Sequence, residues 1–260
     1  MKDFKVITSR ENSLIKLTSL LQSSRSSRKE NGLFVLEGLR ICKDAAENGI
    51  WFDKLIISES ASVKLKTEIE IFEEISDECF MIPDSLFKKI SDTTSPQGII
   101  AIAHVPDNKK IDIDNKGKYI ALENLQDPSN LGAISRTAEA LGISGLILSA
   151  NACDPFSPKS LRASMGTLLR MPIFILEDFS SQIANLGLKT YACVVDENAT
   201  HINELCINDG CIFLIGNEAN GLTKETQDNC DYRITIPMKG RAESLNAAVA
   251  ASIVMWEMMK

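Results

Sequence analysis

The 260-residue sequence lacks the patterns that mark several common kinds of binding site. No G-x-x-x-x-G-K-[ST] loop occurs, which speaks against a P-loop nucleotide site. No G-x-G-x-x-G follows a strand-like run, which speaks against an ordinary Rossmann dinucleotide site. Apolar runs fall short of the roughly 20 residues that span a bilayer, and residues 1–5 have no apolar secretory core. We therefore expect a cytoplasmic protein that does not contact the membrane.

Metal-ligating residues are scarce or unsuitably spaced. The chain has 7 cysteines and 2 histidines but no C-x-x-C pair. The cysteines closest in sequence, Cys206 and Cys211, flank a polar turn, and only His104 and His201 could supplement them. An odd number of thiols without metal-type spacing is typical of buried or incidental cysteines in a reducing compartment. We therefore expect no metal site.

Positive charge is also in short supply. The formal net charge is −7, and phosphate contacts need Lys and Arg. Residues 1–31 are an exception, because their seven basic and three acidic side chains give +4. RNA can therefore be a partner through a local patch, although not through bulk charge. The Ser-rich basic stretch 23–29 reads equally well as a solvated helix end or as an RNA-backbone contact. The candidate RNA-binding residues are Lys16, Arg25, Arg28 and Lys29.

Length and hydrophobic pattern indicate two domains of ordinary size. Residues 10–30 are predicted to form a helix, and strands then alternate with helices up to residue 105. The predicted strands of this part are 33–36, 54–58, 79–82 and 98–105, and its predicted helices are 39–48, 62–72 and 85–91. The polar stretch 107–117 is poor in large apolar side chains and reads as a linker. We expect a small α/β domain at 1–105, a linker at 106–117 and a second α/β domain at 118–260.

The second domain continues the alternation of strands and helices. Its predicted strands lie near 119–124, 145–149, 189–195, 211–215 and 232–236, and its predicted helices near 131–141, 180–187 and 244–259. Three of the apolar runs stop at a loop that contains Gly or Pro, with polar residues just beyond. In open α/β sheets, ligands bind beyond the carboxyl ends of the strands, so the three loops indicate one composite site.

These three segments have distinctive sequences. They read YIALENLQDPSNLGAISRT at 119–137, IFLIGNEANGL at 212–222, and ITIPMKG at 234–240 followed by ESLNAAVA at 243–250. In this order they resemble the three signature motifs of the SpoU (TrmH) family in the SPOUT superfamily of methyltransferases. The resemblance implies S-adenosylmethionine as methyl donor and a ribose 2′-oxygen of RNA as acceptor. It also implies a parallel sheet with a C-terminal trefoil knot, which periodicity could not indicate, preceded by a domain that resembles an RNA-binding ribosomal protein.

Asn130 and Arg136 are the candidate catalytic residues of the first motif. Arg136 lies about 200° around the predicted helix from Ile134 and so points away from the core. Taken alone, Asn130 could simply cap this helix, and Arg136 could pair with Glu139 on its surface. The resemblance instead assigns both residues to the catalytic site.

Glu218, Ser244 and Asn246 are the catalytic candidates of the other two motifs. The glycines around Glu218 fit a strand-to-helix turn, but a carboxylate between two asparagines is hard to explain by packing. Ser244 is a favourable residue for capping the last helix. Asn246 lies too far into that helix for a conventional cap and is a poor helix former. The resemblance places all three in the active site.

The resemblance also implies where the donor and a second subunit bind. The residues expected to enclose the donor are Ile215, Gly216, Ile236, Met238 and Leu245. The family is dimeric, and the Ala-rich face of the last helix, which includes Ala247 and Ala251, is the expected subunit interface. An arginine has been proposed as the base in this family, but a guanidinium is effectively never neutral. We expect Arg136 to clamp the phosphate beside the target ribose and to stabilise the developing alkoxide.

The function predicted from the sequence is 2′-O-methylation of a ribose in ribosomal RNA, with the RNA of the large subunit as the favoured substrate. About a hundred residues precede the linker, and the chain ends within the last predicted helix. Family members that act on transfer RNA have short N-terminal extensions and a further helix. A transfer-RNA enzyme and a catalytically silent RNA-binding homologue remain the alternatives.

Overall fold

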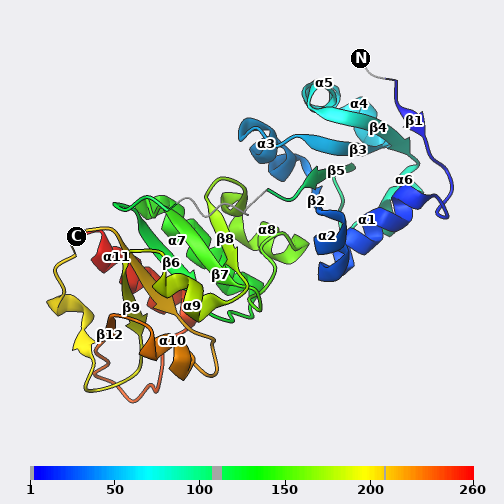
Figure 1. Ribbon diagram of the computed structural model, residues 1–260. Coiled ribbons are helices and arrows are strands. Elements are labelled where there is room, and N and C mark those ends of the chain that lie inside the picture. Colours follow the sequence, from blue (N-terminus) through cyan, green and yellow to red (C-terminus); the bar gives the residue numbers. More distant parts are fainter. Residues whose placement is uncertain (1–2, 107–112, 208) are drawn as a thin grey trace. The chain divides into compact units, whose positions relative to one another are not determined.

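The computed structural model describes residues 3–106, 113–207 and 209–260. Most of the expected linker, residues 107–112, lies outside the described residues. The chain divides into two compact units (Figure 1). The first comprises Met1–Pro106 together with Phe156–Arg170, and the second comprises Asp107–Pro155 together with Met171–Lys260.

The first unit is built on a mixed five-stranded sheet with the strand order β1-β4-β3-β5-β2. β3 and β4 are parallel, whereas β5 pairs antiparallel with both β3 and β2. The elements from residues 3–106 are β1 (Lys5–Val6), α1 (Ser13–Ser23), α2 (Arg25–Asn31), β2 (Leu33–Glu37), α3 (Leu39–Glu47), β3 (Phe52–Ser58), α4 (Glu59–Lys64), α5 (Lys66–Glu74), β4 (Ser76–Ile82), α6 (Asp84–Ile90) and β5 (Ile99–His104).

The single helix predicted at 10–30 is in fact two helices. Ser24 has extended dihedral angles, φ −120° and ψ 118°, so it ends α1, and its side chain caps α2 by accepting from the backbone N–H of Ser27. The leucine spacing indicated helix but could not reveal this break. Ser is a favoured N-cap because its hydroxyl satisfies a backbone donor that has no partner within the helix.

Residues 156–170 pack with the first unit, although the sequence suggested that they belong to the second domain. They form α8 (Pro158–Ser164) and a short 3-10 helix, η1 (Thr167–Leu169). The ring centroids of Phe156 and Phe34 lie 5.1 Å apart. Arg162 forms an ion pair with Asp92 at 2.7 Å. The first unit is therefore discontinuous in sequence.

The second unit contains a seven-stranded sheet with the order β10-β12-β9-β11-β6-β7-β8, in which every pair of neighbours is parallel. This confirms the predicted α/β class with a parallel sheet. The elements are β6 (Lys118–Leu122), α7 (Pro128–Leu141), β7 (Gly145–Ser149), β8 (Ile173–Leu176), α9 (Phe179–Ala184), β9 (Lys189–Cys193), β10 (Thr200–His201), the 3-10 helix η2 (Ile202–Glu204), β11 (Cys211–Ile215), α10 (Lys224–Asp228), β12 (Tyr232–Thr235) and α11 (Ala247–Met258). The expected trefoil knot stays a prediction.

The strands of the second unit are buried on both faces, as in other parallel sheets covered by helices. Every residue of β7 and of β11 is buried. Phe179 and Ile183 of α9 belong to a core cluster with Ala121 of β6 and Leu214 of β11. In the described part of the chain, no helix combines the length and apolar character needed to cross a membrane.

Two helix starts differ from the prediction. Asp127 is the N-cap of α7, with Pro128 in the first turn, so Asn130 lies inside the helix and does not cap it. Asn246 is the N-cap of α11, and its side chain accepts from the N–H groups of Ala248 and Val249 at 2.9 and 3.3 Å. The prediction that Ser244 opens this helix was wrong, because the helix begins only at Ala247.

Candidate active site

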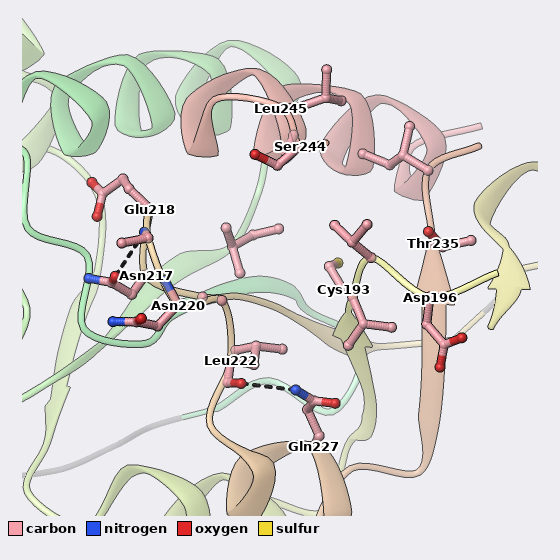
Figure 2. Close-up of a pocket in the computed structure, with 18 of the residues that line it drawn as sticks. Cys193, Asp196, Asn217, Glu218, Asn220, Leu222, Gln227, Thr235, Ser244 and Leu245 are labelled. Atoms are coloured by element: carbon pink, nitrogen blue, oxygen red, sulfur yellow. Dashed lines mark hydrogen bonds between the residues drawn. The ribbon is translucent and has the colours of Figure 1, made fainter. Parts of the chain in front are cut away.

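A cavity of about 490 Å³ lies at the carboxyl ends of β9, β11 and β12. These three strands are neighbours in the sheet, and their last residues, Cys193, Ile215 and Thr235, all line the cavity. Figure 2 shows Ser244 and Leu245 on another side of the cavity, where the chain enters α11. The volume falls in the range of small-molecule and cofactor sites. The position agrees with the general rule for ligand sites in open α/β sheets.

One wall of the cavity is the tight loop that follows β11. Asn217 and Gly221 exchange two backbone hydrogen bonds, at 3.0 and 2.9 Å. The side-chain oxygen of Asn217 also accepts from the N–H groups of Ala219 and Asn220. A Cβ atom on Gly216 would lie only 2.0 Å from the carbonyl carbon of Gly221. Only glycine fits at position 216, since the obstructing atoms are backbone and cannot rotate away.

The carboxylate of Glu218 joins this loop to the start of α7. Its two oxygens accept from the backbone N–H groups of Gln126 and Asp127, each at 3.1 Å. Oε1 also accepts from the side-chain amide of Asn130 at 3.0 Å. Figure 2 shows the carboxyl group directed away from Cys193 and Thr235 across the cavity.

The hydrogen-bonded chain continues from Asn130 to Asn246. Nδ2 of Asn246 donates to Oδ1 of Asn130 at 3.1 Å, while Oδ1 of Asn246 caps α11. Because an ionised carboxylate can only accept, Glu218 requires the NH₂ group of Asn130 to face it. The oxygen of Asn130 then faces Asn246. One carboxylate thus sets the orientation of both amides and ties the three sequence motifs together.

Glu218 stays ionised at neutral pH. Burial by itself would raise its pKa, but the hydrogen bonds from Asn130 and from the backbone N–H groups of Glu218 itself, Asp127 and Gln126 outweigh burial and lower the pKa. A carboxylate whose pKa is lowered by such bonds is a weak proton acceptor. This geometry supports a positioning role for Glu218 and not the role of a general base.

Cys193 places a thiol at the cavity wall. Burial raises the pKa of Cys193 well above its usual value. The group is therefore a neutral thiol at physiological pH, and the thiolate is the nucleophilic form of cysteine. The seven cysteines are thiols that take no part in disulfides. Within residues 3–106, 113–207 and 209–260, no group of three or more His, Cys, Asp or Glu is placed to hold a metal ion.

Most of the residues predicted from the motifs lie at this site. The cavity is lined by all five residues expected to enclose the donor and by two of the catalytic candidates, namely Ile215, Gly216, Ile236, Met238, Leu245, Glu218 and Ser244. Asn130 and Asn246 do not line it but are connected to it through Glu218. Arg136 is exposed elsewhere, in a hollow between α7 and α11 that is also lined by Trp256. Among the described residues it makes no ion pair, including none with Glu139.

The sequence-based site missed the contribution of β9. Val194, Val195 and Asp196 line the cavity directly after this strand. The sequence pattern used for the other loops was present here as well, because an apolar run is followed by the polar residues 196–198. Gln227 of α10 was missed too. It donates to the carbonyl oxygen of Leu222 at 2.9 Å, which its isolated position in the sequence could not indicate.

The predicted RNA-binding residues lie on α1 and α2 of the first unit. Lys16, Arg25 and Lys29 are exposed. Arg28 is only 5% exposed, and its guanidinium donates to the carbonyl oxygens of Leu21 and Gln22 at the end of α1. The expectation for Arg28 is therefore corrected, since this side chain stabilises the end of a helix and does not face a ligand.

Two of the three motif segments line the cavity, and the first is joined to it through Glu218. The part of the chain that contains all three matches a known family. The model of the SpoU rRNA Methylase family matches residues 117–256, which is more than half of the chain. The chain belongs to the SpoU rRNA methylase family. The model of the MRM3-like substrate binding domain matches residues 12–101 in the first unit. The family resemblance seen in the sequence motifs is confirmed.

The similarity of this SpoU methylase to known proteins covers nearly its whole chain. The 23S rRNA (guanosine(2553)-2′-O)-methyltransferase RlmP of Bacillus subtilis is 27% identical over 256 residues, covering 98% of this chain and 99% of its own. The 23S rRNA (uridine(2479)-2′-O)-methyltransferase of Streptomyces viridochromogenes is 29% identical over 264 residues, covering 98% and 91%. The structure of an AdoMet-bound rRNA methyltransferase from Sinorhizobium meliloti is similar with a TM-score of 0.85 and 28% identity, covering 98% and 97%.

Proposed function

We propose that this SpoU methylase transfers a methyl group from S-adenosylmethionine to a ribose 2′-oxygen of ribosomal RNA. The observation that supports this most strongly is the cavity of about 490 Å³, because all five residues expected to enclose the donor line it. Relatives over the full length of the chain are named 23S rRNA 2′-O-methyltransferases, and a similar structure has AdoMet bound. We place the reaction in the cytoplasm.

The residues of the cavity fit the proposed donor. Apolar side chains of Ile215, Ile236 and Leu245 offer surfaces for the flat adenine ring, and the glycine loop allows backbone to approach it closely. The donor supplies a methyl group on a positively charged sulfur. Cys193 does not compete with the ribose for this methyl group, because its raised pKa keeps the thiol neutral.

Chemistry at the ribose requires mainly orientation and the placement of charge. Glu218 holds Asn130, and through it Asn246, so the amides are fixed before RNA arrives. Arg136 has no competing ion pair among the described residues, and its planar guanidinium suits bidentate contact with a phosphate. We assign Arg136 to the phosphate beside the target ribose and to stabilisation of the 2′-oxygen as it loses its proton.

The position of Arg136 points to a homodimer. It lies six residues after Asn130 on α7, which places the two side chains about 240° apart around the helix. The hollow that contains Arg136 also contains Trp256 of α11, which is 59% exposed. A second copy seated on this surface would bury Trp256 and bring its own Arg136 toward the neighbouring subunit.

The surface of α11 that remains open differs from the predicted one. Ala247 and Ala251 are 6% and 0% exposed, so the Ala-rich face packs within its own chain. The residue pair Val249 and Trp256, seven positions apart and thus on the same face, is 48% and 59% exposed. A helix that is apolar on its outer face as well is typical of a further packing contact. We therefore assign the dimer interface to the Val249–Trp256 face.

We propose ribosomal RNA, and not transfer RNA, as the substrate because of the first unit. Residues 12–101 match a substrate-binding domain, and two full-length relatives, those from Bacillus subtilis and Streptomyces viridochromogenes, are named 23S rRNA enzymes. The test is methyl transfer from labelled S-adenosylmethionine to 23S ribosomal RNA and to bulk transfer RNA, followed by mapping of 2′-O-methyl groups. Labelling of transfer RNA alone would favour the transfer-RNA alternative. Absence of calorimetric heat at high micromolar donor would favour the silent homologue.

A further inference from the structure

A hollow between α1 and α6 on the first unit combines positive charge with an apolar floor. Its volume is about 420 Å³. Arg10, Lys16 and Lys89 line it, and all three side chains are exposed. Between them lie apolar residues, of which Leu20 is 51% exposed and Ile90 is buried. Neither the motif loops nor the cavity of the second unit involve these residues.

The cations of the hollow are available to an incoming anion. Glu11 pairs with Nζ of Lys16 at 2.8 Å and with Nε of Arg10 at 3.3 Å. These pairs are solvent-exposed, and such pairs stabilise a fold by little, so an RNA phosphate can replace the carboxylate at small cost. In the part of the chain that the structure describes, Lys89 forms no ion pair. The hollow therefore has more positive charge than its one acid balances, in a protein whose net charge is −7.

The apolar floor distinguishes this hollow from a simple basic patch. Lys16 and Leu20 are four residues apart on α1 and so stand next to each other on the same face. A large exposed aliphatic side chain beside a lysine fits an unstacked base whose own phosphate contacts the lysine. Single-stranded RNA presents bases in this way, whereas a regular RNA duplex keeps them stacked inside.

We propose that the α1–α6 hollow binds a single-stranded segment of the RNA substrate, with phosphates on Arg10, Lys16 and Lys89 and a base against Leu20. This inference rests on the proposed function, because it takes RNA to be the substrate. It names the site in the first unit through which that RNA is held. An acidic protein segment is the competing occupant, and its carboxylates could pair with the three cations without any contact with Leu20.

The experiment compares three variants of the full-length protein with the wild type. Lys16→Gln/Lys89→Gln removes two phosphate contacts, and Leu20→Gln removes the apolar contact. Lys64→Gln/Lys66→Gln is the matched control, because both lysines are exposed on the same unit outside the hollow. Each protein is titrated with a single-stranded RNA oligonucleotide, with an RNA duplex and with a polyglutamate peptide over a range of salt. Melting temperatures verify that the exposed substitutions leave the fold intact.

The proposal predicts a different signature for each variant. Lys16→Gln/Lys89→Gln should reduce the slope of log affinity against log salt by about 1.4, since each contact with single-stranded nucleic acid contributes about 0.7. Leu20→Gln should weaken binding of the single strand several-fold without changing the slope. The control should bind like the wild type.

Two outcomes would overturn the inference while leaving the proposed function intact. In the first, the wild type methylates RNA and both hollow variants bind the single strand as the control does. In the second, the hollow variants lose only polyglutamate binding, which would assign the hollow to a protein partner. If the wild type neither binds nor methylates any RNA, the proposed function itself fails.

Discussion

Glu218 and Asn130, 88 residues apart in sequence, are joined by a hydrogen bond of 3.0 Å between a carboxylate oxygen and a side-chain amide. The same carboxylate holds two backbone N–H groups at the start of α7. Since the amide of Asn130 in turn receives a hydrogen bond from Asn246, the loop after β11 and the first turns of α7 and α11 are coupled. A change at Glu218 should therefore disturb residues that never touch it.

Glu218→Gln tests this coupling with almost no change in shape. The new NH₂ group would face N–H donors, so one or more hydrogen bonds are lost. Because Glu218 is solvent-exposed, the expected destabilisation is at most about 1 kcal/mol. Methyl transfer should slow by about a hundredfold or more. A hundredfold loss corresponds to an activation free energy raised by about 2.7 kcal/mol, which the displaced amides of Asn130 and Asn246 would cause. Thermal unfolding and transfer of a labelled methyl group measure the two effects. Unchanged transfer would show that Glu218 does not position the site.

The wild type should also respond to acid through Glu218. Its pKa is lowered in the folded protein, so its contribution to stability is present above the unfolded value of about 4.3 and is lost as pH falls through the folded value. Over this acid range, unfolding free energy should fall less steeply with decreasing pH in Glu218→Gln than in the wild type. Between pH 6 and 8 the two curves should run parallel.

Arg136→Ala should abolish methyl transfer while donor affinity stays within a few-fold, because Arg136 does not line the cavity. Arg136→Lys should also fail, since an ammonium group cannot reproduce a planar bidentate contact. Kinetics and calorimetric titration separate the two effects. Equal loss of donor binding would refute the assigned role.

Mixed dimers decide whether Arg136 serves its own subunit or the partner. If it serves the partner, combining Arg136→Ala and Glu218→Ala chains after unfolding and refolding together should restore about a quarter of wild-type activity, because half of the dimers then have one complete site in two. If Arg136 acts within its own chain, the mixture should stay inactive. Each variant refolded alone is the control.

If the exposed face of α11 forms the dimer interface, a charged substitution on it should reduce the mass of the particle in solution from dimer to monomer. Val249→Glu places a charge on the exposed face of α11, and the protein should then sediment at the monomer mass of 28.6 kDa. Ile71→Glu is the matched control, because Ile71 is 53% exposed on α5 of the other unit. A wild-type protein that already sediments as a monomer would refute the dimer.

Gly216→Ala should weaken donor binding. The added Cβ would meet backbone of Gly221 and Leu222 at 2.0 and 2.1 Å, so the loop has to open. We expect donor affinity to fall by about tenfold or more, equivalent to about 1.4 kcal/mol. Gly240→Ala is the control, because no atom lies within 4 Å of its added Cβ. Normal calorimetric binding by Gly216→Ala would contradict the proposed wall of the cavity.

The sequence predicted the positions of most strands and two of the loops that meet at the cavity, those after β11 and β12, because those depend on local patterns. Apolar runs near 145–149 and 211–215 coincide with β7 and β11. The short strand β8 was missed, since Ile173–Leu176 follows a proline and is too brief to show a period.

What the sequence could not show depends on neighbours that are distant along the chain. Asn246 looked too far into its helix to act as a cap, but the residues just ahead of it are not helical and the helix starts one residue later. Arg28 looked like part of a basic surface, yet the end of α1 takes up its guanidinium. The Ala-rich face of α11 was predicted to be open to a second subunit, but Ala247 and Ala251 are buried within their own chain, whereas Val249 and Trp256 are exposed.

The discontinuity of the first unit has a consequence for how the chain folds as it is made. Synthesis proceeds from the N-terminus, and domains generally fold as units once their residues have emerged. The first unit lacks Phe156 and Arg170, with their contacts to Phe34 and Asp44, until β6, α7 and β7 have already been synthesised. The first unit therefore reaches its complete packing only after residues 107–155 of the second unit have been made.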